Sequence, residues 1–215
     1  LAELLLAKTA GNPFFTTQFL MSLHSDGLIA FDAEHAQWSC RIERVAAAGT
    51  TDNVADLMSR KIDRLAPVTQ GVLTLAACVG HRFDARTLAV VSEQSLPATL
   101  SDLAEAELEG LITAEDEHAF AFLHDRVQQA AYGILSEKQR GESHLRIGRL
   151  LLRASQEVQD TSRVFEIADH LLAGAGLIDS DTERLEAAQA AHRAGSRARA
   201  SAAFEPAQSY FGAGI

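Results

Sequence analysis

The pattern of hydrophobic and polar positions changes most clearly at residues 120–135, FAFLHDRVQQAAYGIL. Residues 120–123 place two phenylalanines on one face and an alanine and a leucine on the other, which is the period-two pattern of a strand. From Val127 onward the apolar positions follow a helical period and form one stripe. The pattern predicts a strand that runs directly into an amphipathic helix, with His124 at the junction.

The junction residues His124 and Asp125 are candidates for binding an anion. Asp125 is well placed to be the N-cap or a first-turn carboxylate of the predicted helix, where it would accept backbone N–H groups and face the positive end of the helix dipole. His124 lies at the same helix N-terminus, whose N–H groups can hold a phosphate. A histidine that ends a strand and hydrogen-bonds locally has the same pattern, so the residues alone leave both interpretations open.

The first residues of the chain predict two helices separated by a tight turn. Residues 1–10 form a leucine-rich helix that ends at Gly11, which tolerates a left-handed C-terminal cap. Asn12 is the predicted N-cap of a second helix, which has Pro13 at its first position and continues to about Ser25. Pro13 therefore offers a rigid, flat face, although an ordinary helix cap has the same composition.

A predicted hairpin follows these helices. Residues 28–31 and 37–42 are short β-like runs around a polar turn, and the second run carries Trp38. A linker of small residues comes next, after which Asp52 or Asn53 can cap a further helix.

The middle of the chain has the order of elements found in winged-helix folds, namely helices followed by a two-stranded wing. The predicted helices are 68–79, 83–91 and 100–109, and the predicted strands are 111–113 and 119–123. Recognition helices need outward Arg, Lys, Asn or Gln to read base edges. The candidate recognition helix presents carboxylates instead, which argues against reading of the major groove.

After the junction helix the apolar positions stay helical to the end of the chain. Residues 183–200 and 202–211 predict an alanine-rich helical hairpin, in which small residues permit the close packing of helical repeats. Because one repeat cannot stand alone, we expect the repeats to continue beyond Ile215. Pro206 lies inside the last predicted helix, so the pattern does not define the residue at which that helix begins.

Composition and charge narrow the functional classes. The 215 residues are 47% hydrophobic, 22% charged and only 6% aromatic, which favours a globular, mainly helical protein. The net charge of −10 predicts a surface that repels nucleic acid and anionic membranes. Residues 124–153 are net positive and follow the acidic segment 100–123, so the two segments could attract each other.

The two cysteines and the absence of long apolar runs predict a reduced, cytoplasmic protein with no membrane insertion in this segment. Cys40 and Cys78 are not in a metal-ligand spacing. No apolar run approaches the ~20 residues that span a bilayer. The chain starts at Leu1 and stops within a helical pattern, so we expect it to be part of a longer protein.

The sequence lacks the common motifs of enzyme active sites. It contains no G-x-x-x-x-G-K-[ST] phosphate-binding loop, no G-x-S-x-G, no H-E-x-x-H and no kinase catalytic-loop signature. We therefore do not expect this chain alone to hydrolyse ATP or to be an enzyme.

Several separated segments resemble the C-terminal part of the STAND ATPase module of large bacterial signalling proteins. These proteins carry a serine/threonine kinase domain before the module, and a GAF and sensor histidine kinase region after it. The resembling segments are KTAGNPFF from Lys8, TDNVADLM from Thr51, TLAACVGHRFDARTLA from Thr74, FLHDRVQQAAY from Phe122 and AGSRARASAAF from Ala194.

The resemblance implies a mainly α fold in three parts. Residues 1–65 would be a helical, lid-like subdomain with a small β-hairpin, and residues 66–135 a winged-helix subdomain. Residues 136–215 would be a TPR-like helical repeat region that is truncated at its C-terminus.

The resemblance also implies a nucleotide site for ADP or ATP. In the family, a GxP proline packs on the adenine bound by a preceding P-loop core, which also supplies Mg²⁺, and a His-Asp pair contacts the β-phosphate of ADP in the off state. By resemblance, Gly11, Asn12 and Pro13 form the first motif, and His124 and Asp125 form the second. Exchange of ADP for ATP would release the winged helix and control the attached kinase domains, if the two nucleotides favour different states.

Two other functional classes remain open from the sequence. A transcription regulator with a winged helix and a repeat arm predicts salt-dependent DNA binding. A passive helical-repeat scaffold predicts a protein partner and no effect of nucleotides. The nucleotide switch that the resemblance implies predicts that the partners are the upstream ATPase core and the kinase domains of the same parent chain. It predicts no binding of nucleic acid.

Overall fold

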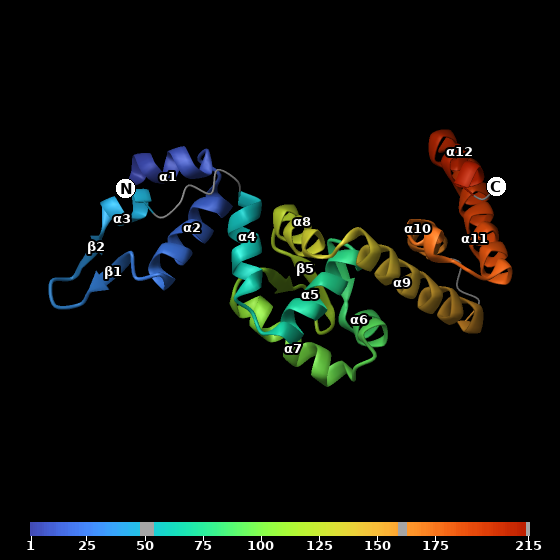
Figure 1. The fold of residues 1–215 in the computed structure, drawn as a ribbon, viewed down its shortest axis with the longest axis horizontal. Coiled ribbons are helices and arrows are strands. Elements are labelled where there is room, and N and C mark those ends of the chain that lie inside the picture. The colour runs from blue at the N-terminus through green and yellow to red at the C-terminus, as the bar shows by residue number, and fades with distance from the viewer. Residues whose placement is uncertain (48–53, 159–162, 214–215) are drawn as a thin grey trace. The chain divides into compact units, whose positions relative to one another are not determined.

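The computed structural model describes residues 1–47, 54–158 and 163–213, and it is mainly helical with two small antiparallel sheets (Figure 1). The mainly α fold class is therefore confirmed. The chain divides into two compact units, Leu1–Arg64 and Leu65–Ile215. The three parts implied by the resemblance stay a prediction, and the proposed caps Asp52 and Asn53 lie outside the described residues.

The first unit combines helices with the predicted hairpin. Its elements are α1 (Ala2–Thr9), α2 (Pro13–Ser25), β1 (Ile29–Asp32), β2 (Gln37–Cys40), α3 (Ile42–Ala47) and α4 (Val54–Asp63). Phe31 pairs with Trp38 across the hairpin, and their rings meet edge to face. Leu23, Ile29 and Val45 form a buried cluster, which joins α2, the hairpin and α3.

The second unit begins with three helices and a three-stranded sheet in the order β3-β5-β4. The elements are α5 (Pro67–Val79), β3 (Arg82–Asp84), α6 (Ala85–Ser92), α7 (Leu96–Leu108), β4 (Ile112–Ala114) and β5 (Ala119–Phe122). The predicted helices and wing are present, and β3 is an additional strand. Phe120 and Phe122 are both buried, as their shared face predicts.

Two predicted helix starts in this unit are wrong. Phe83, expected to open a helix, lies in β3 because its buried ring packs on Phe120 and Phe122, with centroids 6.0 and 5.6 Å away. Asp84 then caps α6 by accepting hydrogen bonds from two backbone N–H groups. Helix α7 starts at Leu96 rather than residue 100, because Ser95 provides its N-cap.

The rest of the second unit is helical. It comprises α8 (Asp125–Ile134), α9 (Glu137–Val158), α10 (Val164–Ala173), the short 3-10 helix η1 (Ala175–Leu177), α11 (Asp181–Ala200) and α12 (Phe204–Ala213). The predicted hairpin of the last two helices is confirmed, and Pro206 is tolerated because it lies in the first turn of α12. Gly148 of α9 lets α10 approach closely, since a Cβ there would lie 2.9 Å from the Leu171 side chain.

No helix in the described parts of the chain is both long and apolar enough to cross a membrane. Both cysteines are free; Cys78 is buried and Cys40 is half-buried, as expected of reduced, partly buried thiols.

Candidate functional site

The Gly11-Asn12-Pro13 turn has the capped geometry that the sequence predicts. Gly11 has a φ of +75°, a conformation that L side chains rarely adopt, so the chain can reverse between α1 and α2. The Asn12 side chain accepts hydrogen bonds from the backbone N–H groups of Phe14 and Phe15, at 3.0 and 3.3 Å. Pro13 follows at the first helical position and is exposed.

A hydrogen bond between two threonines holds this turn. The hydroxyls of Thr9 in α1 and Thr16 in α2 lie 2.9 Å apart. Thr16 also donates to the Asn12 carbonyl at 2.9 Å. The exposed ring of Pro13 is therefore presented from a turn that is anchored on both sides.

His124 is the N-cap of α8, and Asp125 is its first helical residue. His124 Nδ1 accepts a hydrogen bond from the backbone N–H of Arg126 at 3.1 Å. In a neutral ring whose Nδ1 is the acceptor, Nε2 carries the proton and can donate. The local interpretation of His124 is thus present in the structure, and in this tautomer Nε2–H is a hydrogen-bond donor.

His81 joins this site from the segment between α5 and β3. Its Nδ1 lies 3.2 Å from Asp125 Oδ1, and its carbonyl accepts the Phe122 N–H at 2.9 Å. The pair is largely exposed and so contributes little to stability. Sequence reasoning missed His81, because the pairing of β3 with β5 brings it to Asp125 and no spacing in the sequence indicates that contact.

The structure brings the predicted residues together in two separate groups. Gly11, Asn12 and Pro13 share one turn of the first unit, whereas His124 and Asp125 share the start of α8 in the second.

The candidate recognition helix α7 uses acidic side chains for internal contacts. Glu105 accepts hydrogen bonds from the backbone N–H of Ala66 at 3.1 Å and the Thr69 hydroxyl at 2.6 Å, so it stabilises the start of α5. Glu107 accepts the Ala114 N–H of the wing at 3.2 Å. These carboxylates help to hold the fold together.

A pair of histidines, the half-buried His144 and the buried His170, joins α8, α9 and α10. His144 Nδ1 lies 2.8 Å from His170 Nδ1, and His144 Nε2 lies 3.0 Å from the Tyr132 hydroxyl. Burial, followed by the neighbouring His144, lowers the pKa of His170 to about 4, and burial also lowers the pKa of His144. Between two neutral rings, one Nδ1–H donates to the other Nδ1, so the two histidines have different tautomers. Sequence reasoning missed it, because its members lie 26 positions apart on different helices.

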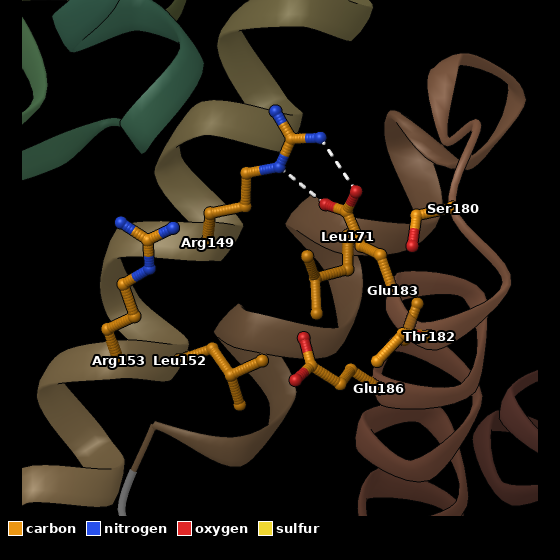
Figure 2. Close-up of a pocket in the computed structure, with 9 residues that line it drawn as sticks. Arg149, Leu152, Arg153, Leu171, Ser180, Thr182, Glu183 and Glu186 are labelled. Carbon is orange, nitrogen blue, oxygen red and sulfur yellow. Dashed lines mark hydrogen bonds and ion pairs between the residues drawn. The ribbon is translucent and has the colours of Figure 1, made fainter.

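A pocket of about 510 Å³ lies among α9, α10 and α11 (Figure 2). Arginines of α9 line one wall, and glutamates and hydroxyl side chains at the start of α11 line the other. The lining residues are Arg149, Leu152, Arg153, Leu171, Ser180, Thr182, Glu183, Glu186 and Ala187. Arg149 and Glu183 bridge the walls through two hydrogen bonds, and the guanidinium lowers the pKa of the Glu183 carboxyl. Sequence analysis did not predict this pocket.

The chain is similar to a segment of a eukaryotic signalling protein. Hybrid signal transduction histidine kinase G of Dictyostelium discoideum is 28% identical over 264 aligned positions, which cover 98% of this chain. The chain spans about 8% of the length of that relative. No protein-family model matches the chain, and no solved structure matches it significantly.

Proposed function

We propose that the chain is a regulatory segment of a signal-transduction protein and contributes contacts to an ADP/ATP switch of the STAND type. The similarity along the whole chain to a hybrid signal transduction histidine kinase supports the signalling role. The P-loop core, its Mg²⁺ and the kinase outputs would belong to other parts of the same parent chain. The observation that supports the nucleotide contact is the hydrogen bond that His124 Nδ1 accepts from Arg126 N–H, which assigns the donor role to Nε2.

The turn at Gly11, Asn12 and Pro13 would provide the adenine contact. Pro13 is exposed and has no N–H group to satisfy, so its ring suits packing against a planar base. The Asn12 cap and the threonine hydrogen bond hold that ring in place. These features fit a role of Pro13 in positioning the adenine ring of a nucleotide.

The start of α8 would provide the phosphate contact. His124 Nε2–H would donate to a β-phosphate oxygen, and the positive end of the α8 dipole favours the same negative charge. The Asp125 carboxylate opposes an anion, and His81 at 3.2 Å offsets it when protonated. The donor set therefore fits a phosphate, with His81 as an additional participant.

Such a segment regulates by binding one nucleotide state better than the other. A nucleotide shifts the equilibrium between two conformations only by its difference in affinity for them. His124, with the Asp125–His81 pair beside it, would stabilise the ADP-bound state, and loss of the His124 contact would favour release of the 66–135 segment. The result would be a change in the activity of attached kinase domains.

The deciding experiment measures ADP affinity by calorimetry on the parent protein with its P-loop core. His124→Asn keeps a side-chain acceptor at the N-cap but moves the donor, so we expect unchanged unfolding and ADP binding weaker by about tenfold, the value of a charge-assisted hydrogen bond. Pro13→Ala should also weaken binding.

The matched control for the proline is Pro97→Ala, since Pro97 also lies in the first turn of a helix, α7. It should leave ADP affinity unchanged. If His124→Asn and Pro13→Ala also leave it unchanged, both motifs are only helix caps, and the helical-repeat scaffold becomes the better explanation.

A further inference from the structure

We infer that the pocket among α9, α10 and α11 binds a small zwitterion with an aliphatic side chain, of the free α-amino acid class. None of its lining residues belongs to the proposed nucleotide site. The inference rests on the charges and the apolar surface of the pocket, and it goes beyond the nucleotide switch.

One charged pair of the pocket is already satisfied. Arg149 Nη2 donates to Glu183 Oε2 at 2.8 Å, and Arg149 Nε donates to the other carboxylate oxygen. This two-point contact ties α9 to α11 (Figure 2). It joins the two walls of the pocket at one point.

Two opposite charges remain on facing walls. Arg153 comes from α9 and Glu186 from α11; both are exposed, and within the described chain neither makes an ion pair within 4.0 Å, although the charge of Arg153 helps to lower the pKa of the Glu183 carboxyl. The Ser180 hydroxyl, at the N-cap of α11, forms no capping hydrogen bond and adds a polar contact beside them. A ligand carboxylate would pair with Arg153, and a ligand ammonium with Glu186.

Leucine side chains provide the apolar part of the pocket. Leu152 and Leu171 are 7% and 1% exposed, and Figure 2 shows Leu152 between Arg153 and Glu186 and Leu171 above Glu186. An aliphatic side chain that covers them would gain hydrophobic stabilisation. The volume of about 510 Å³ is typical of small-molecule pockets.

The charge balance selects against other ligand classes. Two arginines and two glutamates give the lining no net formal charge. A phosphate or nucleotide would meet the repulsion of Glu183 and Glu186, and a simple cation would meet that of the arginines. An uncharged apolar ligand would gain no ionic contact with Arg153 or Glu186, so a zwitterion fits best.

Calorimetric titration of the 215-residue chain with L-leucine tests this inference without any nucleotide, so its result is separate from that of the ADP experiment. We expect one binding site. N-acetyl-L-leucine, which lacks the ammonium, and L-leucinamide, which lacks the carboxylate, should each bind about tenfold more weakly.

Variants assign each ligand end to its wall. Arg153→Gln should lower the affinity for L-leucine about tenfold and leave the affinity for L-leucinamide unchanged. Glu186→Gln should lower the affinity for L-leucine and leave the affinity for N-acetyl-L-leucine unchanged. Arg86→Gln removes an exposed arginine of α6 outside the pocket and should leave the affinity for all three ligands unchanged. Circular dichroism checks that each variant folds.

Two results would overturn the inference. One is the absence of L-leucine binding to the unsubstituted 215-residue chain. The other is binding of N-acetyl-L-leucinamide as tightly as L-leucine, because that ligand has no charged ends and the walls would then play no part.

Discussion

Single hydrogen bonds decide what the histidines of this chain can do. At His124, the backbone N–H of Arg126 occupies Nδ1 and so directs the donor role to Nε2. At His144 and His170, the short Nδ1 contact requires one ring to donate and the other to accept. Protonation of His170 is unfavourable in the folded state mainly because the ring is buried, and the neighbouring His144 adds to this effect.

Stability should fall as pH decreases from about 6.5 to about 4, in part through His170. The folded protein resists protonating this residue, whose pKa is lowered from 6.5 to about 4, while the unfolded chain protonates normally. Acid therefore favours the unfolded state, by about 3 kcal/mol for such a shift. Urea unfolding at several pH values measures the effect.

The comparison for this prediction is between two histidine variants. His170→Leu should show a smaller loss of stability over that pH range than the parent. His192→Leu, at an exposed position of α11, should retain the dependence of the parent. Equal pH dependence in all three proteins would contradict the role of His170.

At the scale of elements, caps and close approaches place the helices. Asn12, Asp84 and Ser95 each accept backbone N–H groups at a helix start, and these contacts involve residues within three positions. The separation of α9 from α10 depends instead on the missing side chain of Gly148. Leu171, which lies against that glycine, also lines the pocket.

Gly148→Ala should destabilise the protein. The new Cβ would lie 2.9 Å from Leu171 side-chain atoms and 3.0 Å from its backbone nitrogen, so α10 must shift. We expect the free energy of unfolding to fall by about 1–3 kcal/mol, as in other overpacked cores. Chemical denaturation provides the measurement.

Gly71→Ala is the matched control for this substitution. Gly71 lies in α5, and a Cβ there would meet no atom within 4 Å. We expect a gain of up to about 1 kcal/mol from helix propensity. Equal effects of the two substitutions would show that the approach of α10 to α9 is not tight.

At the scale of the whole molecule, charge argues against nucleic-acid binding. The net charge is −10, and two arginines of the basic segment are paired within the protein. Arg146 pairs with Glu93 at 2.8 Å, and Arg149 pairs with Glu183; neither glutamate lies in the acidic segment 100–123 that the sequence suggested as the attracting surface.

The chain should therefore not bind duplex DNA at physiological salt. Fluorescence anisotropy with a labelled duplex of mixed sequence measures this, and we expect no change on addition of protein. Binding that weakens steeply with added salt would contradict the expectation and favour the transcription-regulator alternative.

Local features of this protein could be predicted from its sequence. The Asn12 cap, the hairpin that carries Trp38 and the change from strand to helix at His124 depend on neighbours within a few positions, and the structure contains all three. The fold class was predictable for the same reason, because helical periodicity extends through most of the chain.

Only the tertiary structure decided the contacts between distant segments. Phe83 became a strand residue because β5 pairs with it, and that pairing also carried His81 to Asp125. The packing of α9 on α10 joined His144 to His170, and together with α11 it formed the pocket. Caps and periodicity act within about one helical turn and are encoded locally, whereas sheet register and helix packing depend on residues that the chain brings together only on folding.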